Sequence, residues 1–159
     1  MATKIKDRPK ARSGHDSDLY SWVQEQVALL KAGRLDEIDA DNIAEELRDV
    51  GNSEYAQLES ALRVLIMHML KWDQQPEFRT RSWVFTIAEQ RDRYAVVLRK
   101  NPGLKQHLET MRSDVYRSAR RWAANETNLH ESEFPRECPY DWDDLLSRPF
   151  ETDSVPAPK

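Results

Sequence analysis

The sequence has 159 residues, a length typical of one domain with a single hydrophobic core. Charged residues make up 33% of it, and no apolar run reaches the roughly 18 residues of a transmembrane helix, so we expect no membrane span. Four glycines are too few for a Gly-rich phosphate-binding loop, and one cysteine excludes an internal disulfide framework and a cysteine-based zinc site.

The first part of the chain predicts a tail and a helix. Residues 1–15 are basic and have no apolar periodicity, so we expect a mobile tail and no signal peptide. Asp16–Ser17–Asp18 are good N-cap residues, and the apolar spacing after them predicts a helix that ends at Gly33.

The next helix is predicted to start at Asp39 or Asp41. Ile43, Leu47 and Val50 recur at helical spacing, and we expect this stripe to face a core. Gly51–Asn52–Ser53 leaves two possibilities open: Ser53 caps a new helix, or the glycine kinks a longer one.

Residues 54–72 are the most apolar segment, with apolar side chains around most of the helix, which places this segment at the centre of the fold. Ser82 is expected to cap the following helix, which closes at Asn101–Pro102–Gly103. The last long helix is predicted from about Leu104 to Asn128, with a seam made of Leu104, Leu108, Met111, Val115, Ala119 and Trp122.

A Pro-rich segment follows the last long helix. Its apolar residues (Phe134, Cys138, Tyr140 and Trp142) are expected to form a strap that covers the end of the bundle, and residues 141–146 a short helical turn. We expect residues 148–159 to form a flexible tail. No alternating β pattern of useful length occurs. The sequence therefore predicts an all-α, compact bundle of four to five helices, with one domain over residues 16–147.

Charge is segregated along the chain, although the net charge is only −4. Residues 16–60 carry twelve acids against three bases, a balance of −9, whereas residues 79–121 carry eleven bases against four acids, a balance of +7. We favour acidic and basic helices packed side by side, since a pI near 5.6 disfavours nucleic-acid binding. Binding of a nucleic acid by the 79–121 segment is the weaker alternative.

Several polar residues interrupt or border the apolar stripes, where they must be satisfied if they are buried. We predict that they meet in one polar pocket, made of Gln26, Glu46, His68, Gln90 and Arg91 and walled by Trp22, Trp72 and Trp83. His107 flanks the seam of the last helix.

This polar pocket has two interpretations. A carboxylate beside an imidazole is a proton-transfer pair or half of a metal site. There is no HExxH and no Glu-x-x-His motif, so we predict no metal and no cofactor and assign no catalytic residue. The favoured interpretation is a hydrogen-bonded core network that fixes the helix register. The acidic surroundings of Cys138 disfavour a nucleophilic thiolate there.

Five blocks of the sequence resemble a known bacterial family, domain-of-unknown-function family twenty-nine, which is chiefly cyanobacterial and proteobacterial. The blocks are Leu19–Tyr20–Ser21–Trp22, Ile43–Ala44–Glu45–Glu46–Leu47, His68–Met69–Leu70–Lys71–Trp72, Thr86–Ile87–Ala88–Glu89–Gln90–Arg91 and Cys138–Pro139–Tyr140. The resemblance covers residues 16–147 and departs at Gly103, where a serine is expected. It implies an all-α cytoplasmic protein with no assigned activity, and it carries no catalytic residue to this chain.

Three functions are compatible with these observations. We rank first a non-catalytic module that binds another protein or itself, because there is no catalytic motif, five tryptophans are present and charge is segregated. A small-molecule or metal pocket built on Glu46, His68, Gln90 and Arg91 ranks second. Nucleic-acid binding ranks last.

Overall fold

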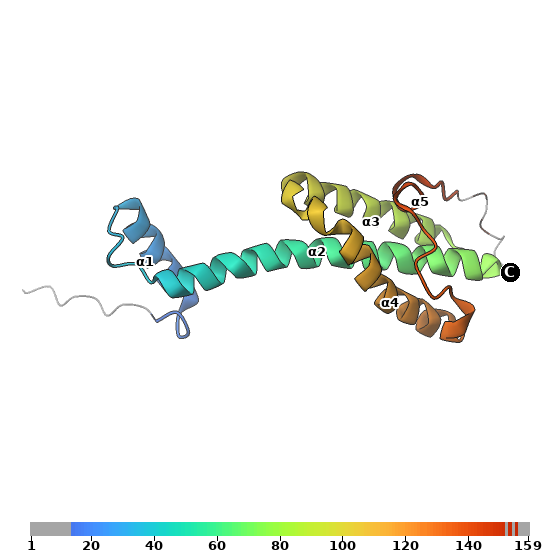
Figure 1. The fold of residues 1–159 in the computed structure, drawn as a ribbon, viewed down its shortest axis with the longest axis horizontal. Coiled ribbons are helices and arrows are strands. Elements are labelled where there is room, and N and C mark those ends of the chain that lie inside the picture. Colours follow the sequence, from blue (N-terminus) through green and yellow to red (C-terminus); the bar gives the residue numbers. More distant parts are fainter. Residues whose placement is uncertain (1–13, 152, 154, 156–159) are drawn as a thin grey trace, which may run out of the picture. The chain divides into compact units, whose positions relative to one another are not determined.

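The computed structural model describes residues 14–151, 153 and 155. They form five α-helices (Figure 1): α1 (Leu19–Lys31), α2 (Ala40–Gln74), α3 (Arg81–Lys100), α4 (Leu108–Thr127) and α5 (Trp142–Ser147). Short 3₁₀ helices cover Pro76–Phe78, Pro102–His107 and Glu131–Glu133, and this part of the chain contains no strand. The predicted all-α class with four to five helices is confirmed. The predicted basic tail lies, up to residue 13, outside the described residues.

The helix ends follow their capping residues closely, with one correction. The Asp18 carboxylate accepts the Ser21 N–H at 3.0 Å, and Gly33, with φ of +68°, follows the end of α1. The prediction that Ser82 caps the next helix is wrong. Thr80 is the N-cap of α3, because it has extended dihedral angles and its hydroxyl accepts the Trp83 N–H at 3.3 Å.

The last long helix also starts later than predicted. Residues from Pro102 to His107 form a 3₁₀ helix, so α4 begins at Leu108 and not at Leu104. It ends at Thr127, and its C-cap Asn128 has a left-handed conformation with φ of 55°. The predicted short turn near the C-terminus is α5, which Asp141 caps through the Asp144 N–H.

α2 continues without a break through Gly51, so the longer helix is the correct alternative there. By its contacts the chain divides into two compact units, residues 1–51 and 52–159, and this division falls directly after the same glycine. The single helical domain over residues 16–147 stays a prediction.

The second unit contains a large hydrophobic core, as expected for the central segment. The second half of α2 packs with α3 and α4 (Figure 1), and its residues Leu58, Leu62 and Leu65 are fully buried. The segment after α4 adds Phe134 and Tyr140 to this core, in agreement with the predicted strap. Trp122 differs from the predicted seam: it is half exposed, and the Arg63 guanidinium lies 5.4 Å from its ring.

The first unit has a much smaller core. Trp22, Gln26 and Leu29 of α1 are its buried residues among those described. The expectation that the Ile43–Val50 stripe faces a core is wrong for Leu47, which is 66% exposed, and for Val50, which is 62% exposed. Within this unit α1 is tied to the start of α2 through Asp39, and residues 47–51 of α2 are exposed.

Candidate functional site

Polar side chains hold the first unit together around Asp39, which lies directly before α2. Its backbone N–H donates to Oε1 of Gln26 at 2.8 Å, and its carboxylate accepts from the Trp22 indole N–H at 3.2 Å. The buried amide of Gln26 therefore joins α1 to the start of α2. Gln26 and Trp22, both predicted for the pocket, thus bond to the same residue, Asp39.

Glu46 bonds to a histidine, but that histidine is His15 and not His68. Nε2 of His15 lies 2.7 Å from the Glu46 carboxylate, and Nδ1 lies 2.8 Å from Asp16. The imidazole also stands edge-on to the Trp22 ring, with 4.8 Å between the centroids. The hydrogen bond to Glu46 is the main reason that the pKa of His15 is raised above its ordinary value, and Asp16 adds to it.

A cavity of about 340 Å³ lies beside this network. Its lining includes Trp22 and Gln26, and the complete set is Gly14, His15, Trp22, Glu25, Gln26, Glu37, Ile38 and Asp39. Hydrogen bonding, first of all from the Asn42 side chain, lowers the pKa of Asp39. The cavity wall therefore carries an ionised carboxylate beside an imidazole that protonates readily.

In the second unit, His68 makes a bond within its own helix. Its Nδ1–H donates to the Val64 carbonyl at 2.9 Å, and burial is the main cause that lowers its pKa. Close by in sequence, Lys71 pairs with Glu126 at 2.5 Å and lies 4.5 Å from the Trp83 ring centre. Thus His68 is a neutral, half-buried side chain, and Trp83 packs against a buried lysine.

The Arg91 side chain bonds to backbone carbonyls at the C-terminal end of α5. Its guanidinium donates to the carbonyls of Asp144 at 3.0 Å, Leu145 at 2.7 Å and Arg148 at 2.8 Å. The last carbonyls of a helix have no partner within it, and a cation there also complements the helix dipole. All three bonds are to backbone, so Arg91 anchors the C-terminal segment.

That segment is held further by contacts that the sequence does not reveal. Arg148 donates to both carboxylate oxygens of Asp73, at 2.6 and 3.0 Å, and the Tyr140 hydroxyl donates to the same carboxylate at 2.8 Å. Burial first, and Asp73 second, raise the pKa of Tyr140. Arg148 lies inside the region expected to be a flexible tail, and a separation of 75 residues from Asp73 leaves no local signal for the pair.

Phe150 brings two predicted site residues together. Its ring lies edge-on to Trp72 at 5.4 Å and 5.3 Å from the Arg91 guanidinium. Gln90, the neighbour of Arg91 on α3, is buried, and its Oε1 has no hydrogen-bond partner among the described residues. An unpaired buried acceptor destabilises a fold, so Gln90 is the least explained of the five polar residues.

The predicted pocket residues therefore occur in two sets of contacts. Gln26, Glu46 and Trp22 belong to the first unit, and the rest belong to the second, namely His68, Gln90, Arg91, Trp72 and Trp83. A single pocket that combines all of them stays a prediction. Residues 14–151 contain no group of three His, Cys, Asp or Glu side chains placed to hold a metal ion.

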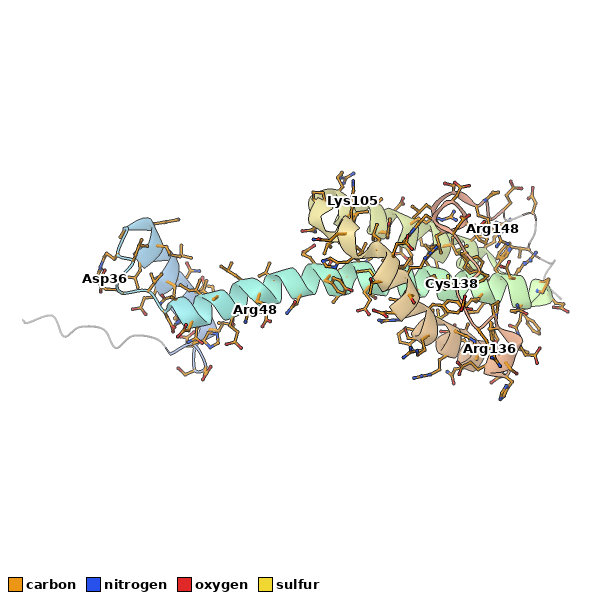
Figure 2. All side chains as sticks on the ribbon, viewed as in Figure 1. Asp36, Arg48, Lys105, Arg136, Cys138 and Arg148 are labelled. Carbon is orange, nitrogen blue, oxygen red and sulfur yellow. The ribbon has the colours of Figure 1, made fainter. Side chains whose placement is uncertain are left out.

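A larger cavity, of about 500 Å³, lies in the second unit between α4 and the segment that follows it. No pattern in the sequence predicts this cavity. Figure 2 shows two of its residues, Arg136 and Cys138, on the segment after α4. Four arginines line it, in the full set Glu109, Arg112, Ser113, Tyr116, Arg117, Arg120, Arg136, Glu137 and Cys138. The basic balance of residues 79–121 was the available signal, but no local pattern places Arg136 beside α4.

The comparisons with known proteins agree with the resemblance seen in the sequence. None of the described helices is both long and apolar enough to cross a bilayer. Neither the curated proteins nor the solved structures include a match to the chain. The model of one family, described as Domain of unknown function DUF29, matches residues 15–151. With nearly its whole length covered by that model, the chain belongs to the DUF29 family.

Proposed function

We propose that this protein is a non-catalytic interaction module that associates with a second copy of itself through its first unit. The observation that carries the proposal is the number of apolar side chains that this unit leaves exposed. Among described residues the first unit buries two hydrophobic side chains, Trp22 and Leu29, and exposes seven large ones: Leu19, Tyr20, Val27, Leu30, Leu35, Leu47 and Val50.

The exposed side chains of α1 and α2 are arranged in stripes. At about 100° per residue, Leu19, Val27 and Leu30 lie within an arc of about 80° on α1, next to the buried arc of Trp22 and Leu29. Leu47 and Val50 lie close together on α2 by the same geometry. Single exposed leucines are ordinary, but grouped apolar side chains are typical of protein interfaces.

The distribution of charge indicates which surface of a second copy contacts the first unit. Residues 14–51, the described part of the first unit, carry ten acids against three bases, a balance of −7, so these parts of two copies repel each other. Residues 79–121 carry a balance of +7 and expose Phe85 and Val96 on α3. A second copy therefore offers a basic surface with apolar side chains, and we infer a head-to-tail contact between unlike surfaces.

The polar residues support a structural role over a catalytic one. His68 and Arg91 donate to backbone carbonyls, and Glu46 is paired with His15. His68 and Arg91 are thus engaged with the backbone, and Glu46 contributes to the contacts that hold the first unit together. A cytoplasmic location and a bacterial source, which the family resemblance implies, stay predictions.

The test is the molar mass in solution, measured by sedimentation equilibrium over a wide concentration range at low and high ionic strength. We expect the mass to rise with concentration at low salt and to fall towards the monomer at high salt, because salt screens surface charges. The double variant Leu47→Ser/Val50→Ser is expected to stay monomeric. Leu146→Ser, which changes an exposed leucine of α5, is the control and is expected to associate normally.

A mixing experiment tests the head-to-tail geometry. A chain with Arg99→Glu/Lys100→Glu has a weakened basic surface, and the Leu47→Ser/Val50→Ser chain has a weakened first unit. Each alone is expected to be monomeric, and an equimolar mixture is expected to form a dimer through the two intact surfaces. Wild-type protein that stays monomeric at every concentration would overturn the proposal. Retardation of DNA or RNA at low salt, without self-association, would instead favour nucleic-acid binding.

A further inference from the structure

The arginine-lined cavity of the second unit is built by α4 and by the segment that returns along it. On α4, Arg112, Tyr116 and Arg120 follow at intervals of four residues and so form one row on the helix. The returning segment is fixed to this row by two bonds: the Tyr116 hydroxyl donates to the Pro135 carbonyl at 2.7 Å, and Arg112 donates to the Tyr140 carbonyl at 3.1 Å. These bonds place the two walls of the cavity.

Two of the four arginines are held in place by the protein. Arg112 also bonds to Glu109 at 2.9 Å, and Arg120 bonds to the Glu131 carboxylate at 3.2 Å and to its carbonyl at 2.7 Å. Such anchored guanidinium groups lose little conformational freedom when a ligand arrives.

The other two arginines have no partner in the described part of the chain. Neither Arg117 nor Arg136 makes a hydrogen bond or ion pair there, so their donors are available. The lining holds four arginines against Glu109 and Glu137, so its positive charge exceeds its negative charge even though Glu131 pairs with Arg120. An electropositive, partly enclosed cavity attracts and retains anions.

Cys138 in the cavity wall does not offset this charge. Burial is the main cause that raises the pKa of its thiol, which is therefore protonated and neutral near pH 7. Its Sγ–H donates weakly to the Tyr140 carbonyl at 3.7 Å. The cavity thus has the character of a binding site and lacks a thiolate nucleophile.

The geometry points to a binding site for a small organic molecule that carries a phosphate monoester. A phosphate dianion complements the positive charge of the lining, and guanidinium groups bind its oxygens in pairs. The volume of about 500 Å³ is in the range of small-molecule sites, roughly 300–1,000 Å³, and leaves room for the organic part beyond the phosphate. This site belongs to the second unit and does not depend on the proposed self-association.

Calorimetry and cysteine protection can test the site on the full chain. The probes are glucose 6-phosphate and adenosine monophosphate, with glucose, adenosine and inorganic phosphate as comparisons. Cys138 is the single cysteine of the chain and lines the cavity, so its slow alkylation by iodoacetamide at alkaline pH, where a fraction of the thiol is ionised, reports occupancy. We expect at least one of the two organic phosphates to bind and to slow alkylation, and glucose and adenosine to do neither.

Matched arginine variants assign the binding to this cavity. Arg117→Gln/Arg136→Gln is expected to weaken Kd by at least about tenfold, because each lost charge-assisted contact contributes roughly a factor of ten. Arg121→Gln removes one positive charge from an exposed, non-lining position of α4 and is expected to leave Kd unchanged. Circular dichroism checks that all variants keep their helix content.

Three results would overturn the proposal. The first is the absence of both heat and protection with the organic phosphates. The second is a Kd that the double variant leaves unchanged or that Arg121→Gln weakens equally, since either excludes this cavity as the site. The third is equal affinity for inorganic phosphate and for the organic phosphates, which would leave no role for an organic ligand.

Discussion

The two units of this chain bury their apolar side chains to very different extents. Among described residues the second unit buries 21 hydrophobic side chains and exposes five large ones, whereas the first unit buries two and exposes seven. The first unit is held by hydrogen bonds around Asp39 and His15, and the second by a continuous core with arginine clamps at its C-terminal end. A unit of about 38 described residues is too short to enclose a core of its own, so it leaves apolar surface for a partner.

The largest expected effect is a difference in stability between variants in the two parts of α2. Leu65 is fully buried in the second unit, so Leu65→Ala should lower the free energy of unfolding by about 2–5 kcal/mol. Leu47→Ala, the same change on the exposed part of the helix, should alter it by less than about 0.5 kcal/mol. Urea unfolding at low protein concentration measures both. Equal losses would contradict the difference in burial between the units.

The arginine clamp of the second unit should give the next largest effect. Arg91→Ala removes three bonds to carbonyls at and beyond α5, and we expect a loss of about 1–2 kcal/mol, since the side chain is only partly buried. Arg91→Lys keeps the positive charge but lacks the planar guanidinium with its several donors. We therefore expect it to lose less stability than Arg91→Ala but to stay below the wild type. Hydrogen exchange at residues 142–150 should become faster in both variants. Unchanged exchange would show that the clamp does not hold this segment.

A substitution at Gln90 is expected to stabilise the fold, in contrast to the substitutions above. Its buried Oε1 accepts no hydrogen bond within the part of the chain that the structure describes, so Gln90→Met, which keeps the side-chain length, should raise the free energy of unfolding by about 1 kcal/mol. Thermal unfolding measures this gain. A loss of stability would instead show that the amide is satisfied in solution and contributes to the core network.

The smallest effect concerns His15 in the first unit. The Glu46 carboxylate raises the pKa of His15 above 6.5, so the pair adds stability that is present below pH 6.5 and is lost as the pH rises through the raised pKa. Glu46→Gln should return the pKa of His15 towards 6.5, and its stability difference from the wild type should fade at higher pH. Titration of the imidazole by NMR gives the pKa directly. A pKa that is unchanged in Glu46→Gln would exclude Glu46 as its cause.

Local patterns were sufficient for most helix positions. Asp18 and Gly33 bound α1, and the apolar spacing of residues 54–72 predicted the buried segment of α2, because caps and periodicity act over a few residues. The error at Ser82 has the same local origin, since Thr80 two positions earlier satisfies the same N-cap requirement. Helical geometry also selected Gln26 and Gln90 as polar residues on buried faces, and both are buried.

The sequence did not predict which side chains bond to each other. Nothing local indicates that Glu46 bonds His15 over His68, that Asp73 pairs with Arg148, or that Arg136 joins the arginines of α4 around one cavity. A helical pattern defines which face of a helix is apolar, because that depends on about 3.6 residues per turn. Which groups meet across that face depends on how distant segments pack, and only the tertiary structure decides it.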